Sequence, residues 1–250
     1  MKVTPRVLIL GGTTEARSLA GSLAGREDCD VVSSLAGRVA SPRMPVGQVR
    51  VGGFGGASGL AAWIDAHGIR AVIDATHPFA AQISRNAAAA AAASHVPLLA
   101  LRRKAWVPAE GDRWHEATSL EDAALMLPAL GRRHFLTVGR QGVSSFAEVT
   151  DAWFLVRAVD PPAGPLPPRM ELLLDRGPYM PDAELALMRD RGVDTLITKN
   201  SGGDGTAAKL LGARELGLPV VMVRRPATPA GVPEVAHVPA AAEWVAAQVL

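Results

Sequence analysis

Short apolar runs alternate with longer segments of helical pattern through the first hundred residues. The first run, Val7-Leu8-Ile9-Leu10, shows no polar alternation and leads directly into Gly11-Gly12-Thr13-Thr14. An apolar strand of this kind is typical of a parallel sheet that is buried on both faces. The pattern predicts strands at 6–10, 30–33, 48–51, 69–74 and 97–101, and helices at 13–24, 58–67 and 79–94.

Residues 102–118 break this alternation, and a second series of elements follows them. We therefore predict an α/β fold of two Rossmann-like units with parallel sheets flanked by helices, and an active-site cleft between them. The predicted domains are residues 1–101 and 102–250, with the last helix able to pack back on the first domain. The second series comprises helices at 119–130, 143–149, 182–191, 205–216 and 239–249, and strands at 133–138, 152–159, 170–174, 194–198 and 219–223.

The first strand-to-helix turn has the composition of a phosphate-binding loop. Gly11 and Gly12 let the backbone approach a ligand closely, and the next helix start presents unpaired N–H groups and a positive dipole end. Thr13 and Thr14 add hydroxyl donors at the same place. These features predict a pyrophosphate cradle. An ordinary turn capped by threonine explains the same residues equally well, because the full G-x-G-x-x-G spacing is absent.

The residues at the end of the second predicted strand favour a pyrophosphate-binding role for the glycine turn over an ordinary turn. A dinucleotide fold that prefers NAD places an acidic residue there for the ribose hydroxyls. Here the tip carries Ser33 and Ser34, with Arg38 just beyond, and these suit the 2′-phosphate of NADP(H). A polar loop with one solvated arginine is the alternative. We assign NADP(H) binding to the first domain, through Gly11, Gly12, Thr13, Thr14, Glu15, Ser33, Ser34, Arg38 and Thr76.

Composition narrows the class of protein. The 250 residues are 48% hydrophobic and carry a formal net charge of only +2, with no basic run interleaved with aromatics. Nucleic acid is therefore not expected as a partner, whereas anionic small molecules are. One cysteine, Cys29, and six scattered histidines predict neither a disulfide nor a metal site. The apolar stretch 87–93 is too short to span a bilayer and no signal peptide is visible, so we expect a cytoplasmic protein.

Further polar segments follow predicted strands, where ligands bind in open α/β sheets. Thr76 and His77 follow strand 69–74, although a capping or loop histidine would look the same. Arg140 suits a substrate carboxylate, and the glycine-rich stretch 198–206 suits an anion-binding nest or an ordinary loop. No serine-nucleophile elbow, H-E-x-x-H or Tyr-x-x-x-Lys motif accompanies them.

Six segments in order resemble the signature segments of precorrin-6A reductases, over residues 6 to about 226. The resemblance implies an NADPH-dependent reduction of a vitamin B12 precursor to precorrin-6B. The substrate would be a large tetrapyrrole with many carboxylates, and other pathway enzymes would be partners only through substrate hand-over. The segments are Gly11–Arg17, Asp74–Ala80, Gly139–Gln141, Val159–Pro162, Arg176–Tyr179 and Thr198–Gly203.

Under this resemblance the second domain binds the substrate and two residues handle the proton. His77 and Lys199 are the expected catalytic residues, and imidazole is the better donor near neutrality. Three alternatives stay open: cobalt-precorrin-6A as substrate, another anionic substrate, and a non-catalytic NADP(H)-binding sensor. The expected substrate-binding residues are Arg140, Gln141, Arg176, Tyr179, Lys199, Asn200, Ser201 and Gly202.

Overall fold

The computed structural model describes residues 4–37 and 40–249, and the chain divides into two compact units. The first comprises Met1–Lys104 together with Pro226–Leu250, and the second comprises Ala105–Arg225. The chain therefore crosses between the units twice. This division differs from the expected domains, because residues 226–250 return to the first unit instead of completing the second.

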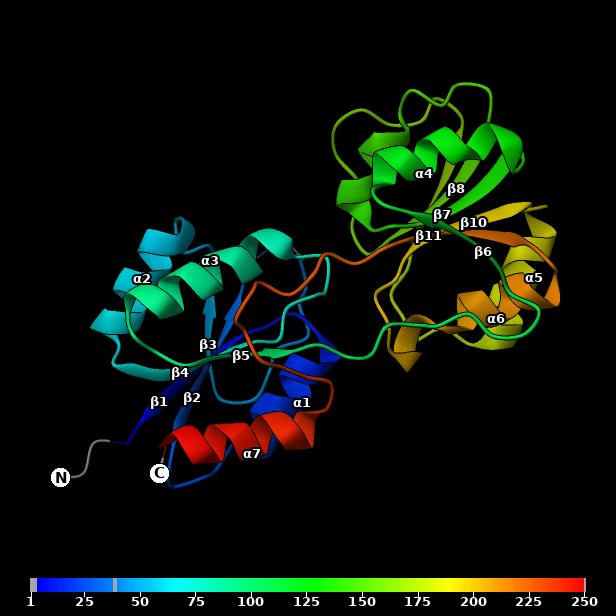
Figure 1. Cartoon of the computed structure of the whole chain (residues 1–250). Coiled ribbons are helices and arrows are strands. Elements are labelled where there is room, and N and C mark those ends of the chain that lie inside the picture. The colour runs from blue at the N-terminus through cyan, green and yellow to red at the C-terminus, as the bar shows by residue number, and fades with distance from the viewer. Residues whose placement is uncertain (1–3, 38–39, 250) are drawn as a thin grey trace. The chain divides into compact units, whose positions relative to one another are not determined.

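The first unit is built on a six-stranded sheet in the order β12-β5-β4-β1-β2-β3, in which all described neighbours are parallel (Figure 1). Its strands are β1 (Arg6–Leu10), β2 (Asp30–Leu35), β3 (Gln48–Val51), β4 (Ile69–Asp74), β5 (Leu98–Leu101) and β12 (Glu234–Val235). Its helices are α1 (Thr14–Leu23), α2 (Gly56–Ala66), α3 (Ala81–Ala93) and α7 (Val238–Val249).

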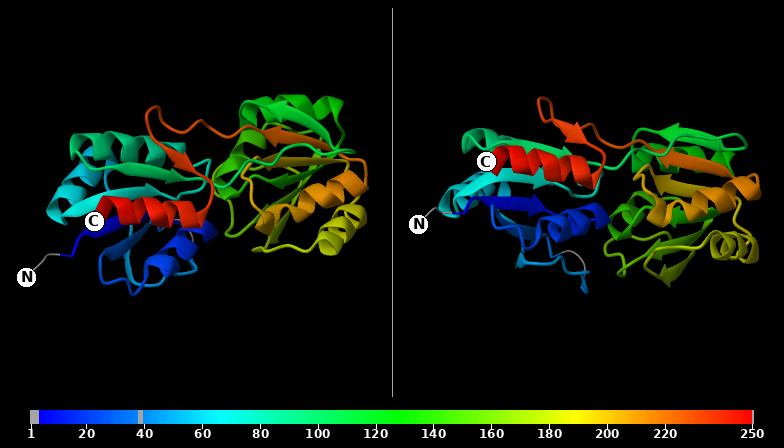
Figure 2. Two further views of the ribbon diagram at one scale, coloured as in Figure 1. Left: turned by 60° about the horizontal axis from the view of Figure 1, so that its bottom comes forward. Right: turned by 90° about the horizontal axis from the view of Figure 1, so that it is seen from below.

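The alternation of side chains along β1 explains the two layers of helices in this unit. Val7 and Ile9 face a core shared with α1 and α7, whereas Leu8 and Leu10 face a core shared with α2 and α3. All four are at most 2% exposed, as expected for a central parallel strand. The red α7 thus belongs to the same unit as the blue α1 (Figure 2).

The second unit repeats this plan with the strand order β6-β11-β10-β7-β8-β9, again parallel throughout the described pairs. Helices α5 and α6 share a core on one face, and α4 with η2 covers the other (Figure 1). Its strands are β6 (Arg113–Ala117), β7 (Arg133–Thr137), β8 (Trp153–Ala158), β9 (Met170–Leu174), β10 (Thr195–Lys199) and β11 (Pro219–Val223). Its helical segments are α4 (Leu120–Met126), η1 (Leu127–Ala129), η2 (Arg140–Phe146), α5 (Pro181–Asp190), η3 (Asp204–Thr206) and α6 (Ala208–Glu215).

Several predicted elements need correction. The expected crossover 102–118 contains the edge strand β6, whose largely exposed residues carry no apolar pattern. The predicted helix 143–149 is a 3-10 segment at Arg140–Phe146, and the helix predicted from residue 79 begins at Ala81. The predicted strand 30–33 continues to Leu35 because β3 pairs with it as far as that residue. The short strand β12 pairs with Ala100 and Leu101, a contact that no local sequence pattern predicts.

Candidate functional site

The strands of each unit are parallel, so their carboxyl ends meet at one edge of each sheet. The described members of the predicted set in the first unit lie after β1, near the end of β2 and after β4, and β1 is the direct neighbour of both other strands. Those of the second unit follow β7, β9 and β10, of which β7 and β10 are direct neighbours. Both sets therefore lie at the edge where open α/β sheets bind ligands.

The turn after β1 leaves its backbone accessible. The amide of Gly11 donates to the carbonyl of Ser34 at 2.9 Å, which fixes the turn against β2. Gly12 has a φ of +118°, and a side chain at this position would meet no atom within 4 Å. With the start of α1 directly behind it, this open loop fits the pyrophosphate of a dinucleotide.

The threonine hydroxyls of the turn have protein partners. Thr13 Oγ1 accepts from the amide of Ala16 at 3.1 Å and donates to the carbonyl of Ala75 at 2.8 Å. Its single donor therefore stabilises the start of α1 and the end of β4, which differs from the expected phosphate donor. Thr14 Oγ1 accepts from Arg17, and the Glu15 carboxylate pairs with Arg103 at 3.0 Å. The ion pair offsets the negative charge of Glu15 at the anion-binding end of α1.

The two serines do not form the tip of β2, because the strand runs on to Leu35. Ser33 is 2% exposed, and its hydroxyl has no hydrogen-bond partner within the described chain. The hydroxyl of Ser34 accepts from Nη1 of Arg50 at 3.1 Å. Arg38, which we expected beside them, lies outside the described residues. The cation that the structure shows next to this strand is Arg50.

The segment after β4 is ordered by short hydrogen bonds. Both the amide and the hydroxyl of Thr76 donate to Oδ1 of buried Asp74, at 3.1 and 2.6 Å. His77 is exposed, and its Nδ1 accepts from the amide of Phe79 at 3.2 Å. A neutral His77 ring with Nδ1 as acceptor carries its proton on Nε2. This turn also explains why α3 begins later than predicted.

Lys199 ends β10 at the corresponding edge of the second unit. Burial of its amino group lowers the pKa of Lys199 below the ordinary value for lysine. The backbone then turns sharply, with the amide of Ser201 donating to the carbonyl of Lys199 at 2.7 Å. Ser201 is itself buried, and Gly202 has a φ of +67°. Lys199 is thus a partly desolvated amine beside a tight polar loop.

The side chain of Asn200 is engaged by the segment that enters this unit. Its Oδ1 accepts from the amide of Trp106 at 2.9 Å, and its Nδ2 donates to the carbonyl of Trp106 at 3.0 Å. Its own carbonyl accepts from Arg225 Nε at 3.1 Å. Asn200 therefore fixes both places where the chain enters and leaves the second unit, in addition to the substrate role that we expected.

Arg140 and Gln141 follow β7 and open η2, directly after Gly139 with a φ of +77°. Gln141 is exposed and Arg140 is partly buried. Thr137 of β7 pairs with Thr198 of β10, so the ends of these strands lie side by side. The structure therefore brings Arg140 and Lys199 to adjacent strand ends.

Arg176 and Tyr179 lie in the turn after β9, which contains the cis peptide bond Gly177–Pro178. The ring of Tyr179 stacks on the guanidinium of Arg157, with 3.7 Å from Cζ to the ring centroid. Arg157 also forms a two-fold ion pair with Glu184 of α5, in which both side chains are nearly fully buried. Burial raises the pKa of Tyr179.

Sequence reasoning missed four buried or half-buried cations near these edges, two of which had a signal in the sequence. Arg50 and Arg157 stand within apolar strand runs, where a charge requires partners. Lys209 is 4% exposed, donates to the carbonyl of Thr206 and faces the Trp106 ring at 4.7 Å. Arg102 donates to the carbonyls of Pro78 and Pro226 at 2.8 and 3.0 Å.

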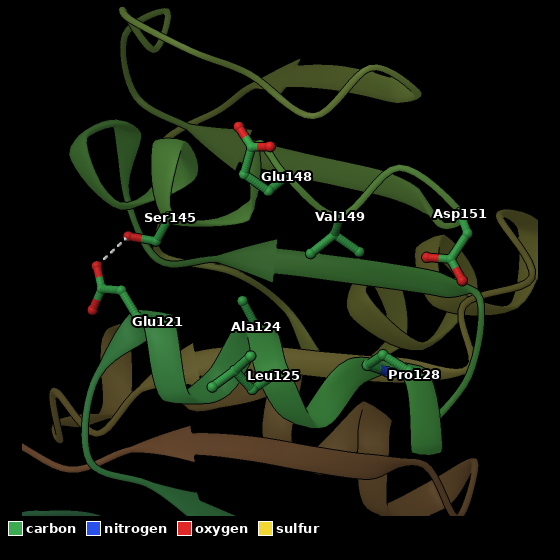
Figure 3. Close-up of a pocket in the computed structure, with 8 residues that line it drawn as sticks. All are labelled: Glu121, Ala124, Leu125, Pro128, Ser145, Glu148, Val149 and Asp151. Atoms are coloured by element: carbon green, nitrogen blue, oxygen red, sulfur yellow. Dashed lines mark hydrogen bonds between the residues drawn. The ribbon is translucent and has the colours of Figure 1, made fainter.

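A surface pocket of the second unit has none of the predicted substrate-binding residues in its lining (Figure 3). Ser145 donates to Glu121 at 2.9 Å across one end of it, and Leu125 of α4 is 82% exposed beside it. The pocket therefore belongs to the outer surface between α4 and η2. It is lined by Glu121, Ala124, Leu125, Pro128, Ser145, Glu148, Val149 and Asp151.

Comparison with known proteins identifies relatives of the whole chain. A family model described as Precorrin-6x reductase CbiJ/CobK matches residues 6–246. A precorrin-6A reductase of Rhodococcus erythropolis is 57% identical over 240 residues, which are 96% of this chain and 97% of the relative. A cobalt-precorrin-6A reductase of Priestia megaterium is 29% identical over 235 residues, 88% of this chain and 90% of the relative. A solved structure of CobK precorrin-6A reductase has a TM-score of 0.91 at 42% identity and covers 98% of this chain and 97% of its own.

These matches agree with the fold and with the resemblance of the six sequence segments. The predicted α/β architecture with two parallel sheets is confirmed, and so is the prediction that the protein is an oxidoreductase. Within the described residues no helix is long and apolar enough to cross a membrane. The chain belongs to the Precorrin-6x reductase family of cobalamin biosynthesis.

Proposed function

We propose that this protein reduces precorrin-6A to precorrin-6B with NADPH, the first unit binding the cofactor and the second the substrate. The observation that carries this proposal is the 57% identity, over 96% of the chain, with a precorrin-6A reductase. The family match over residues 6–246 includes the glycine turn after β1 and the polar strand ends of both units. A sensor that only binds NADP(H) would not need the polar strand ends of the second unit.

The first unit offers a built place for a dinucleotide. The open Gly11–Gly12 turn, the start of α1 and the Glu15–Arg103 ion pair supply backbone donors and a compensated charge for a pyrophosphate. The sequence has no carboxylate at the end of β2 or directly after it, where a fold that prefers NAD holds one. When bound, the reduced nicotinamide supplies the hydride.

The substrate-binding role of the second unit rests on its cations. Precorrin carboxylates need partners, and Arg140, Arg176 and Lys199 stand after three parallel strands of one sheet. Arginine forks bind carboxylates through paired hydrogen bonds. Gln141, Asn200, Ser201 and Gly202 add polar groups along the same edge, while Tyr179 holds the turn that carries Arg176.

Reduction adds a hydride and a proton, and we propose that a residue of this chain delivers the proton. Lys199 suits this role because burial lowers the pKa of its amine toward the working range of a general acid. His77 is the second candidate, since it is exposed after β4 and an imidazole can exchange protons near neutral pH. His77 lies in the first unit, which we propose binds the cofactor, and Lys199 lies in the second, which we propose binds the substrate.

Cobalt-free precorrin-6A is the better-supported substrate. The chain shares 57% and 48% identity with precorrin-6A reductases of Rhodococcus erythropolis and Mycobacterium tuberculosis, but 29% with a cobalt-precorrin-6A reductase. A direct competition between the two substrates at equal concentration tests this preference. We expect the cobalt-free compound to be consumed first.

The reaction is tested by mixing the purified protein with precorrin-6A under anaerobic conditions and following the absorbance of NADPH, with NADH in a parallel sample. We expect NADPH to be oxidised rapidly and the product to be heavier than the substrate by two hydrogen atoms. Tight NADPH binding without oxidation of NADPH in the presence of either precorrin would support the sensor and contradict the proposal.

A further inference from the structure

Arg50 lies on a row of residues that runs across the first sheet from the glycine turn. In the parallel register Leu10 of β1 pairs with Ser34 of β2, and Ser34 pairs with Arg50 of β3. Neighbouring strands are about 4.8 Å apart, so the backbone of Arg50 is about 10 Å from the end of β1. A dinucleotide whose pyrophosphate sits on the Gly11–Gly12 turn places its adenosine ribose over the end of β2, between these two points.

The guanidinium of Arg50 is held in a fixed orientation. Nη1 donates to the hydroxyl of Ser34 at 3.1 Å and to the carbonyl of Gly52 at 2.8 Å, and Nη2 donates to the carbonyl of Gly53 at 2.9 Å. One face of the group lies over the ring of Phe54, 3.8 Å from its centroid. The ring of Trp63 is farther away, at 5.8 Å. An arginine oriented in this way loses little further side-chain entropy when it binds an anion.

No carboxylate of the described residues forms an ion pair with Arg50. All three of its hydrogen-bond partners within the described chain are neutral oxygens, and they use three of its five N–H groups. Partial burial lowers the pKa of Arg50, which reflects the cost of keeping a cation there without an opposite charge. With neutral partners only and two N–H groups not used by them, Arg50 is suited to bind an anionic group of a ligand.

We propose that Arg50 recognises the 2′-phosphate of the cofactor and thereby sets the preference for NADPH over NADH. The inference rests on the proposed function, because it assumes that a dinucleotide binds to the first unit. Ser34 lies one residue before the end of β2, the strand end at which a NAD-preferring fold holds an acidic residue, and Arg50 supplies a positive charge beside it. Phe54, on the other side of the guanidinium, keeps the fork from turning away.

The test is a binding titration, without substrate, of NADPH and NADH to wild type, Arg50→Met and Arg50→Lys. Loss of a charged hydrogen-bonding partner is expected to raise the Kd for NADPH about 10- to 100-fold in Arg50→Met. The Kd for NADH should change less than about twofold. Arg50→Lys keeps the charge without the planar fork, so we expect an intermediate loss of NADPH affinity.

Two controls separate recognition from folding. Arg70→Met removes an exposed arginine near the opposite end of β4 and should leave both affinities unchanged. The bisphosphate 2′,5′-ADP and the monophosphate 5′-AMP serve as probes that differ by the 2′-phosphate alone. Only the affinity for 2′,5′-ADP should fall in Arg50→Met.

The following results would overturn the inference, and they differ in whether the proposed function survives. Unchanged NADPH affinity in Arg50→Met, or equal losses for NADPH and NADH, would make Arg50 a structural residue of the Gly52–Phe54 turn and leave the proposed function intact. Equal affinity of the wild type for NADPH and NADH would likewise overturn the inference alone. A wild-type protein that binds neither nucleotide would overturn both the inference and the proposed cofactor.

Discussion

At the scale of single residues, the buried polar side chains say more about stability and its pH dependence than the apolar core does. Arg157, Glu184 and His134 are each at most 5% exposed, and Lys199 is partly desolvated. Burying a charge or an imidazole is unfavourable unless the surroundings satisfy it. How these groups are satisfied determines how the protein responds to substitution and to pH.

Removing one partner of the Arg157–Glu184 pair should strongly destabilise the second unit. Glu184→Gln leaves the Arg157 guanidinium buried without its counter-charge, and such a change typically costs about 3–5 kcal/mol of unfolding free energy. The double variant Arg157→Met, Glu184→Leu should recover most of the loss. Denaturant unfolding measures the free energy of unfolding of the single and double variants. A double variant whose loss equals the sum of the losses of its two single variants would contradict this account.

His134 should make the stability depend on pH. Its ring is fully buried, neither nitrogen has a hydrogen-bond partner within the described chain, and burial lowers its pKa, with Asp194 opposing the shift. The unfolded state then binds the proton more readily. The stabilisation is fully present above the unfolded pKa of about 6.5 and is lost as the pH falls below it, by up to about 1.4 kcal/mol per pH unit.

The measurement is the free energy of unfolding between about pH 7.5 and about pH 5.5, roughly one unit on either side of the ordinary histidine pKa. His134→Leu should flatten the fall, whereas the exposed His115→Gln should leave it in place. An identical fall in wild type and His134→Leu would assign the pH dependence to other groups.

Lys199 should control turnover rather than cofactor affinity. As a proton donor it acts in its charged form, so turnover should fall as the pH rises through its lowered pKa. Lys199→Met should reduce kcat about 10²- to 10⁴-fold with NADPH affinity unchanged. Lys199→Arg keeps the charge but removes the alkaline limb of the pH profile, because arginine does not titrate there. A wild-type limb that persists in Lys199→Arg would exclude Lys199 as the donor.

At the scale of elements, the strands and helices were largely predictable and their ends were not. The apolar runs of β1, β4 and β11 are buried on both faces, and this burial produces the pattern seen in the sequence. The ends depend on partners far along the chain. Ser33 and Ser34 read as a strand tip, but pairing with β3 extends the strand past them.

The start of α1 offers a test of such a distant partner. Thr13→Ala removes both the helix cap and the hydrogen bond to Ala75 of the segment after β4, so it should lower the unfolding free energy by about 1–2 kcal/mol. Thr13→Ser keeps both bonds and should cost much less. Thermal and denaturant unfolding compare the two, and equal stability of Thr13→Ala and wild type would show that neither bond matters.

At the scale of the whole molecule, the chain leaves the first unit after Lys104 and returns to it at Pro226. The return was not predictable beyond the packing of the last helix, because β12 has only two residues and pairs with residues more than a hundred positions earlier. The candidate site was partly predictable: the strand ends were found from glycines and polar residues. Arg50, Arg102, Arg157 and Lys209 were missed because each has at least one partner in a distant segment, respectively Ser34, Pro226, Glu184 and Trp106.

The central claim, that hydride passes from NADPH to precorrin-6A on this protein, is tested most directly by isotope transfer. The measurement is the mass of the product formed from precorrin-6A with NADPH deuterated at both hydrogens of C4, in ordinary water. We predict a product that carries one deuterium from the cofactor and one hydrogen from the solvent. A reduced product without deuterium, or no reduced product while NADPH is bound, would contradict the account.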